Sequence, residues 1–110
     1  MDGARGDEGL TVATRREGAR VVVELVGELD LHESERLGAV MSEVMAEPTA
    51  TIELDAAKLT FTDSAGIRAM LVARADAKDR GIEFEVSRVS PPVDRILRIA
   101  GATDLLSDSG

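Results

Sequence analysis

The sequence predicts an α/β domain in which helices pack mainly on one face of a mixed β-sheet. Apolar stretches rich in β-branched residues, typical of strands, alternate with stretches whose apolar residues recur at the three- and four-residue spacing of helices. Two strand-like stretches come first, separated by a turn that contains glycine, which indicates a hairpin. The expected order is therefore β-β-α-β-α-β-α, and right-handed crossovers between the later strands place most helices on one face.

The hairpin occupies the amino-terminal part of the chain. Residues 1–9 are rich in glycine and charge, and we expect a flexible tail there. Leu10–Thr14 is a weakly signalled strand, whereas Arg20–Val26 is a nearly continuous run of β-forming apolar residues. Arg16–Ala19, which contains a glycine, is the expected turn between them.

A first helix follows a turn at Gly27–Asp30, where we expect the second strand to end. It runs from about His32 to Ala46, and Pro48 stops it. Its apolar residues fall on one stripe that we expect to face the core: Leu37, Val40, Met41, Val44 and Met45.

The third strand and second helix flank the most informative turn of the chain. Thr51–Leu54 is a short β-branched strand and Asp55–Lys58 is interpreted as a connection. The helix is expected from Ser64 or Ala65 to about Arg80, before Gly81. Its expected buried stripe is Ile67, Met70, Leu71, Arg74 or Ala75, and Lys78.

The carboxyl-terminal part adds one strand and one helix. Ile82–Ser87 alternates apolar and polar residues, as a half-buried strand does. Ser90 is the expected cap of a last helix with proline in its first turn, and Gly101 closes that helix. Its expected stripe is Val93, Ile96, Leu97 and Ala100. The domain thus spans residues 10–106, and 107–110 are expected to fray.

Composition restricts the function. The chain has 110 residues, enough for one domain, and its core must be aliphatic because aromatic residues make up only 2%. The net charge of −8 disfavours binding to nucleic acid or anionic lipid. No cysteine is present, which excludes disulfides and thiolate chemistry. No run approaches the roughly 20 apolar residues of a membrane span, and there is no signal-peptide pattern, so we expect a cytoplasmic protein.

The turn at residues 63–66, Asp-Ser-Ala-Gly, carries the one chemical feature that stands out. Serine and aspartate cap helix N-termini, so we expect Ser64 at the start of the second helix with its hydroxyl near solvent. The helix dipole favours an anion at that position. By itself, however, this pattern is typical of an ordinary helix cap.

Catalytic equipment is missing around this serine. The single histidine, His32, would have to serve as its base, and the surrounding residues are not Gly-x-Ser-x-Gly. One histidine without cysteine leaves only carboxylates for a metal, and no glycine-rich phosphate loop is present. We therefore interpret Ser64 as a substrate for a kinase. Phosphorylation adds roughly −1.5 to −2 charges, which would disrupt partner binding more than folding.

Three segments together resemble the STAS family, the fold of bacterial anti-sigma factor antagonists. They are Val26–Asp30 (Val-Gly-Glu-Leu-Asp), Leu59–Ile67 (Leu-Thr-Phe-Thr-Asp-Ser-Ala-Gly-Ile) and Val89–Val93 (Val-Ser-Pro-Pro-Val). The resemblance covers roughly Leu10 to Leu106. The family usually continues past this point with a further short strand and helix, and Arg68 occupies a position where a small residue is common.

The resemblance implies a partner-switching mechanism. The unphosphorylated protein would bind an anti-sigma factor with a GHKL-type serine kinase fold and free a sigma factor. That kinase, using ATP and Mg²⁺, would phosphorylate Ser64, and a PP2C-type phosphatase would reverse the reaction. Asp30 and Asp63 would lie beside Ser64, and Gly66, Ile67 and Arg68 would present the first helical turn to the partner. The chain itself would need no cofactor and would not be an enzyme.

Other functions remain open at the level of sequence. A STAS accessory subunit could dock on a transporter ATPase or a larger signalling scaffold, independently of Ser64 phosphorylation. An enzyme would turn over an ester or nucleotide alone and lose that activity in His32→Ala or Ser64→Ala. A ligand sensor would respond to nucleotides in a thermal-shift assay.

Overall fold

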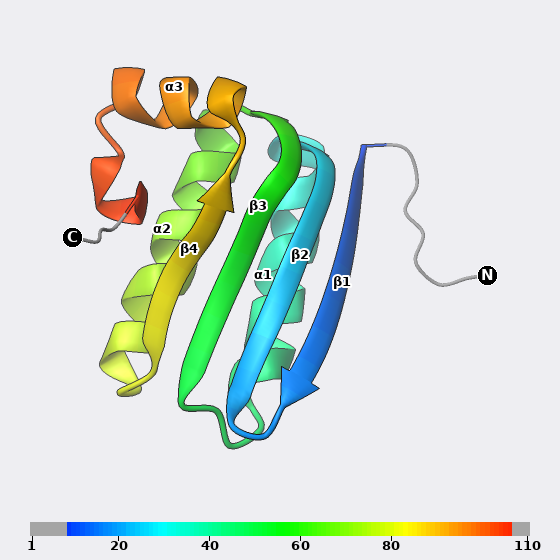
Figure 1. Ribbon diagram of the computed structural model, residues 1–110, viewed down its shortest axis with the longest axis vertical. Coiled ribbons are helices and arrows are strands. Elements are labelled where there is room, and N and C mark those ends of the chain that lie inside the picture. The colour runs from blue at the N-terminus through cyan, green and yellow to red at the C-terminus, as the bar shows by residue number, and fades with distance from the viewer. Residues whose placement is uncertain (1–8, 107–110) are drawn as a thin grey trace.

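A computed structural model describes residues 9–106 of the protein, which form one mixed four-stranded sheet and three α-helices (Figure 1). The sheet order is β1-β2-β3-β4; β1 is antiparallel to β2, and the other neighbours are parallel. The expected order of elements is confirmed. The elements are β1 (Leu10–Glu17), β2 (Arg20–Leu29), α1 (Leu31–Met45), β3 (Thr51–Thr62), α2 (Ser64–Asp79), β4 (Glu83–Val89), α3 (Pro91–Ile99) and a 3₁₀-helix, η1 (Thr103–Leu106).

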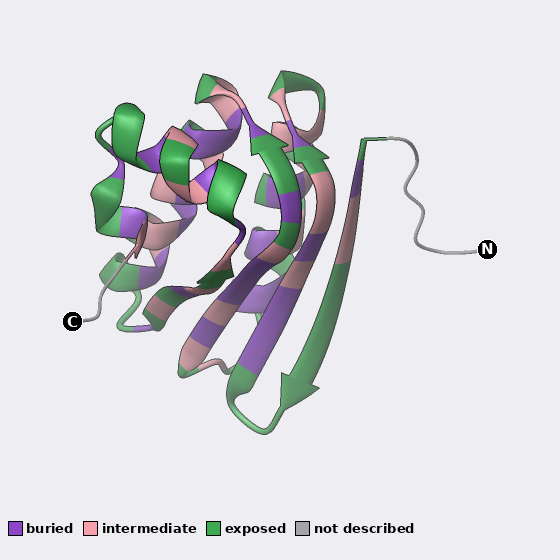
Figure 2. Ribbon diagram, turned by 45° about the horizontal axis from the view of Figure 1, so that its top comes forward, coloured by how far each residue is buried: buried purple, intermediate pink, exposed green. Residues whose placement is uncertain are grey.

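The hairpin turns at Gly18, whose φ of 64° is readily available to glycine. Both of its strands exceed their expected lengths, because Glu17 pairs with Arg20 and the ladder extends to Leu10 opposite Gly27. Only the Leu10 end of β1 is buried (Figure 2). The end of β1 beside the turn is therefore an exposed sheet edge.

The expected turn at Gly27–Asp30 is wrong for its first three residues. β2 continues to Leu29, with shifts in register around Gly27, whose φ is 112°. The Glu28 N–H donates to the Gly9 carbonyl (2.7 Å), which holds Gly9 against the sheet and removes it from the expected tail. Residues 1–8 and 107–110, where a tail and fraying are expected, lie outside the described residues.

β3 differs most from the prediction, because the expected connection at Asp55–Lys58 is part of the strand. Aspartate, alanine and lysine have low strand propensity, but β3 lies between β2 and β4 and hydrogen-bonds to both. A register shift near Ala56 accommodates Asp55, whose carboxylate accepts from Ala57 N–H (3.1 Å) and from Arg88 (2.7 Å). Pairing on both sides thus overrides local preference.

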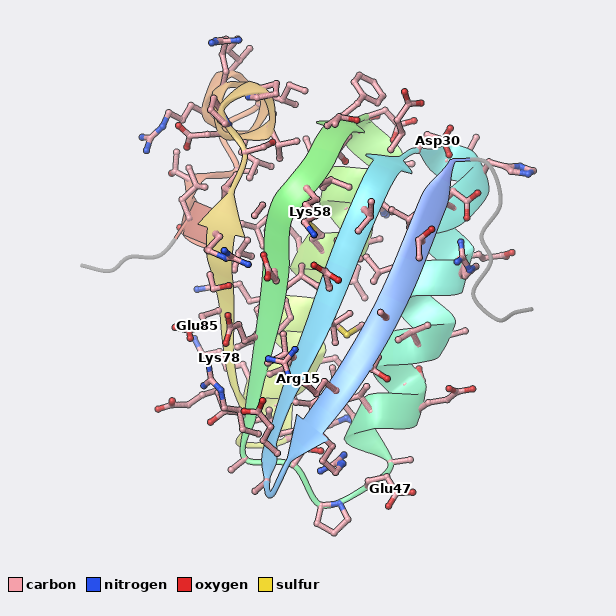
Figure 3. All side chains as sticks on the ribbon, turned by 45° about the vertical axis from the view of Figure 1, so that its right-hand side comes forward. Arg15, Asp30, Glu47, Lys58, Lys78 and Glu85 are labelled. Atoms are coloured by element: carbon pink, nitrogen blue, oxygen red, sulfur yellow. The ribbon has the colours of Figure 1, made fainter. Side chains whose placement is uncertain are left out.

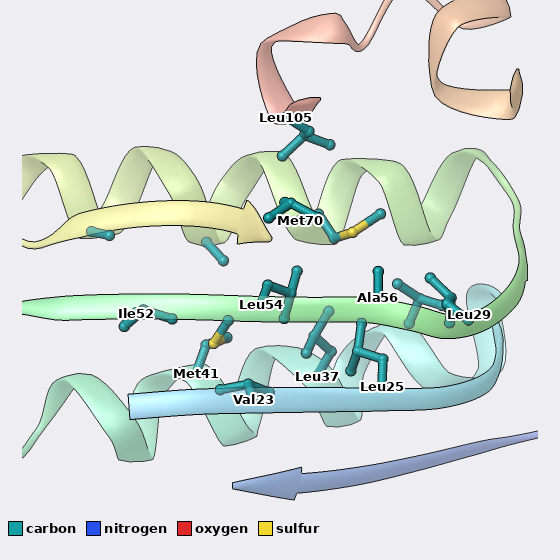
Figure 4. Close-up of a cluster of buried hydrophobic side chains, with 14 of the residues drawn as sticks. Val23, Leu25, Leu29, Leu37, Met41, Ile52, Leu54, Ala56, Met70 and Leu105 are labelled. Carbon is teal, nitrogen blue, oxygen red and sulfur yellow. The ribbon is translucent and has the colours of Figure 1, made fainter. Parts of the chain in front are cut away.

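The core lies between the sheet and the two helices α1 and α2, which cover the same face (Figure 1). Figure 4 shows Leu37 and Met41 of α1 against the strands and Met70 of α2 close to Leu105 of η1. All of the buried hydrophobic side chains are aliphatic or methionine, as the composition predicts.

The buried stripe of α2 is not the expected one. Ile67 and Met70 are buried, but Ala73 and Ala77 continue the stripe in place of Leu71 and Lys78. The small alanine side chains let α2 pack closely against the rest of the domain. In α3, Val93 and Leu97 are buried and Ser90 caps the helix as predicted, whereas Ala100 is exposed.

The opposite face of the sheet is charged and, within residues 9–106, carries no helix (Figure 1). Figure 3 shows Lys58 and Arg15 projecting from it. Three ion pairs connect neighbouring strands there: Arg20–Glu53, Lys58–Glu24 and Arg88–Asp55. Within residues 9–106, no helix is long and apolar enough to cross a membrane.

Candidate phosphorylation and partner-binding site

The candidate site lies where α1 and α2 begin side by side. β2 and β3 are adjacent parallel strands, so the helices that follow them start at the same edge of the sheet (Figure 1). Asp30, labelled in Figure 3, caps α1 by accepting from the Glu33 N–H (3.1 Å). Asp63 caps α2 by accepting from the Gly66 N–H (2.9 Å). Two positive helix ends therefore lie together.

Asp63 joins the two helix starts. One oxygen of its carboxylate caps α2, and the other accepts from the N–H of Leu31, the first residue of α1 (3.0 Å). Its own N–H donates to the Leu29 carbonyl (3.2 Å). A single half-buried carboxylate thus fixes the β2–α1 and β3–α2 junctions relative to each other.

Ser64 is the first residue of α2 rather than its cap, since Asp63 occupies the cap position. Its side chain is exposed as predicted, and its hydroxyl makes no hydrogen bond within residues 9–106. A phosphate on this hydroxyl would lie at the positive end of α2, where an anion is favoured. The Ser64 hydroxyl is thus open to solvent at a helix end that favours an anion.

Gly66 and Ile67 contribute to the site from below the surface, which corrects the expectation that they present the first turn to a partner. A Cβ atom on Gly66 would lie 2.3 Å from Thr62 Oγ1 and 2.5 Å from the Leu29 carbonyl. Ile67 is only 8% exposed and belongs to the core. Of the three residues expected on this turn, only Arg68 is exposed.

Two apolar side chains near Ser64 are missing from the sequence-based site. Leu31 follows the α1 cap and is 73% exposed; Phe61 precedes the α2 cap and is 42% exposed. The sequence signal was an apolar residue within two positions of each aspartate cap. Together they give this end of the molecule an apolar surface beside the two carboxylates.

The described residues offer little for catalysis or metal binding at this site. His32 is exposed in the first turn of α1 and forms no hydrogen bond to Ser64 within residues 9–106. No group of three or more histidine, cysteine or carboxylate side chains suited to a metal occurs in that part of the chain.

Residues 12–107 match the family model described as Mlab, STAS domain. The chain therefore belongs to the STAS domain family.

Curated proteins with similar sequences include an anti-sigma factor antagonist and a transporter. Over 82 residues it is 34% identical to the anti-sigma F factor antagonist of Paenibacillus polymyxa, covering 74% of this chain and 70% of that protein. Over 99 residues it is 34% identical to human sulfate anion transporter 1, covering 86% of this chain but only 14% of the transporter. The matched region thus makes up most of the antagonist but only a small part of the transporter.

The fold is that of a solved antagonist. The anti-sigma factor antagonist SpoIIAA in its unphosphorylated form superposes with a TM-score of 0.75 at 23% identity, covering 90% of this chain and 88% of SpoIIAA. The phosphorylated form of Bacillus SpoIIAA gives a TM-score of 0.68, also at 23% identity, with coverage of 90% and 91%.

Proposed function

We propose that this protein is an anti-sigma factor antagonist whose binding is switched by phosphorylation of Ser64. The unphosphorylated form binds an anti-sigma factor and thereby releases a sigma factor. The observation that carries the proposal is an exposed serine at the first position of α2, beside two joined helix starts. Similarity to the Paenibacillus polymyxa antagonist supports it.

The anti-sigma factor is proposed to be a serine kinase with a GHKL-type fold, using ATP and Mg²⁺. A bond forms between Ser64 Oγ and the γ-phosphorus, the bond from that phosphorus to the β,γ-bridging oxygen breaks, and ADP leaves. The hydroxyl proton passes to a base on the kinase. A PP2C-type phosphatase hydrolyses the product and resets the switch.

Charge explains why phosphorylation would release the partner. The phosphate adds roughly −1.5 to −2 charges beside Asp30 and Asp63. Because it lies at the positive end of α2, the domain remains folded. A partner surface that covers the unmodified serine would then clash with the phosphate and be repelled by its charge.

In this function the protein has no catalytic role and needs no cofactor of its own; ATP and Mg²⁺ belong to the kinase. It acts in the cytoplasm, where sigma factors and their regulators meet. Asp30, Asp63 and Arg68 are the side chains proposed to contact the anti-sigma factor.

Intact-mass analysis tests the proposal directly. The protein is mixed with ATP, Mg²⁺ and, in turn, each candidate anti-sigma factor from its own genome. One added phosphate is expected with the cognate kinase, lost in Ser64→Ala and retained in Thr103→Ala, which removes another exposed hydroxyl. Absence of phosphate and of a complex with every candidate would refute the proposal.

The similarity to human sulfate anion transporter 1 favours one alternative. In that function the domain is an accessory subunit that docks on a transporter ATPase or signalling scaffold. Binding would then be stable and independent of Ser64 phosphorylation. Equal affinity of wild type, Ser64→Ala and Ser64→Glu for such a transporter would support it.

A further inference from the structure

A groove of about 500 Å³ runs between α1 and α2 on the side of these helices that faces away from the sheet. No strand residue lines it. Its lining is mainly apolar and comes from both helices. The apolar side chains include Leu31, Met41 and Met45 from α1, and Ala69, Val72 and Ala73 from α2. The groove is thus a feature of the helix pair alone.

Exposed apolar side chains border this groove. Leu31 is 73% exposed and Val72 is 60% exposed, and they are two of the four large hydrophobic residues exposed in the described chain. The alanines of α2 and Gly38 are small, so a backbone can approach the groove closely. Exposed apolar side chains beside small residues and the buried Met41 and Met45 are typical of a surface that binds an apolar helix face.

The dimensions of the groove set the length of the occupant. Its lining on α1 extends from Leu31 to Met45. At a rise of 1.5 Å per residue this is about 21 Å, which corresponds to a helix of about four turns.

Charged residues at the groove set the orientation of that helix about its axis. Glu35 of α1 and Arg68 of α2 both line the half of the groove nearer Ser64, and neither forms an ion pair within residues 9–106. Asp76, towards the other end, is already paired with Arg80 (3.0 Å). A complementary helix therefore carries a basic residue over Glu35 and an acidic residue over Arg68. A second copy of this chain, with its own net charge of −8, is repelled.

We propose that this groove binds an amphipathic helix of about four turns from the anti-sigma factor. The inference rests on the proposed function and names the surface by which the partner is held. Ala65 and Arg68 line the groove; in α2, Ala65 directly follows Ser64 and Arg68 lies one turn further on. A phosphate on Ser64 therefore lies at the end of the groove, where it competes for Arg68 and repels the acidic residue of the bound helix.

The test compares two exposed apolar residues by substituting each with glutamate. Val72→Glu places a charge in the groove, and Ile99→Glu places the same charge on α3, where Ile99 is 81% exposed and does not line the groove. Both proteins should fold, as circular dichroism would show. With the anti-sigma factor that binds wild type, calorimetry should show at least a roughly tenfold loss of affinity for Val72→Glu. Ile99→Glu should bind like wild type.

Hydrogen exchange on the complex identifies the occupant. A continuous helical segment of the anti-sigma factor, about 14 residues long by its rise, should become protected only in complexes with an intact groove. If Val72→Glu binds like wild type, the groove proposal is wrong although the switch at Ser64 stands. If wild type binds no anti-sigma factor, both proposals fail. A wild-type dimer that Val72→Glu dissociates would assign the groove to a second copy and overturn the inference.

Discussion

Replacing Asp63 with alanine tests whether one carboxylate holds both helix starts. The substitution removes two acceptors, one for the Gly66 N–H at 2.9 Å and one for the Leu31 N–H at 3.0 Å. Loss of a helix cap costs about 1 kcal/mol. Loss of the second hydrogen bond costs about 1 kcal/mol more, which is less than is usual for a charged acceptor because the site is half-exposed and water can replace the carboxylate.

The expected decrease in the free energy of unfolding is therefore about 2 kcal/mol, or about 8 °C in Tm for a domain of this size. Urea and thermal unfolding followed by far-ultraviolet circular dichroism would measure it, since the chain has no tryptophan or tyrosine. Asp30→Ala is the matched control, because Asp30 accepts from only one helix N–H through its side chain. Asp30→Ala should lower the free energy of unfolding by about half as much as Asp63→Ala.

Asp63→Asn refines the comparison, because its amide retains one neutral oxygen acceptor and should fall between wild type and Asp63→Ala. If Asp63→Ala is no more destabilising than Asp30→Ala, the reasoning that Asp63 fixes both junctions is refuted.

Three further outcomes are expected. Gly66→Ala should destabilise the fold by about 2 kcal/mol or more, because the new Cβ atom would lie too close to Thr62 and Leu29. Gly38→Ala is the matched control, because a Cβ atom there meets nothing within 4 Å. It should stabilise α1 by about 0.5–1 kcal/mol in the same urea assay. Burial by itself raises the pKa of Asp55, but hydrogen bonds from Arg88 and the Ala57 N–H outweigh it and lower that pKa overall. The resulting stabilisation is present above the unfolded pKa of about 3.9 and is lost as pH falls through the folded pKa. Urea titrations across that pH range should show that Asp55→Asn loses less free energy of unfolding than wild type does. An equal loss in both proteins would contradict the assignment to Asp55. Finally, Ser64→Ala should bind the anti-sigma factor without being released by ATP, whereas a folded Ser64→Glu should bind weakly in calorimetry; wild-type affinity of Ser64→Glu would argue against the switch.

Prediction from sequence succeeded where the signal is local. The alternation in Ile82–Ser87 predicted β4, and Ser90 followed by two prolines predicted the start of α3, because each pattern depends on a few neighbouring residues. The exposure of Ser64 also followed from its place at the start of a helix.

Prediction failed where residues distant in the sequence determine the local structure. Asp55 lies in a strand because β2 pairs with it and β4 pairs with its neighbours Leu54 and Ala56. Arg88 forms an ion pair with its carboxylate. Gly66 looks like a surface turn residue in sequence, but Leu29 and Thr62 close over it.

The order of strands and helices, the aliphatic core and an accessible serine at the start of α2 could all be predicted from the sequence. Periodicity and capping act over a few residues, and composition needs no structure at all. Tertiary contacts, in contrast, were needed to show that Asp63 accepts hydrogen bonds from the starts of both helices and that α1 and α2 form a groove beginning near Ser64. Both depend on the parallel pairing of β2 and β3, which brings together helix starts more than thirty residues apart in the chain. No pattern within a few neighbouring residues could predict a contact between segments so far apart in the chain.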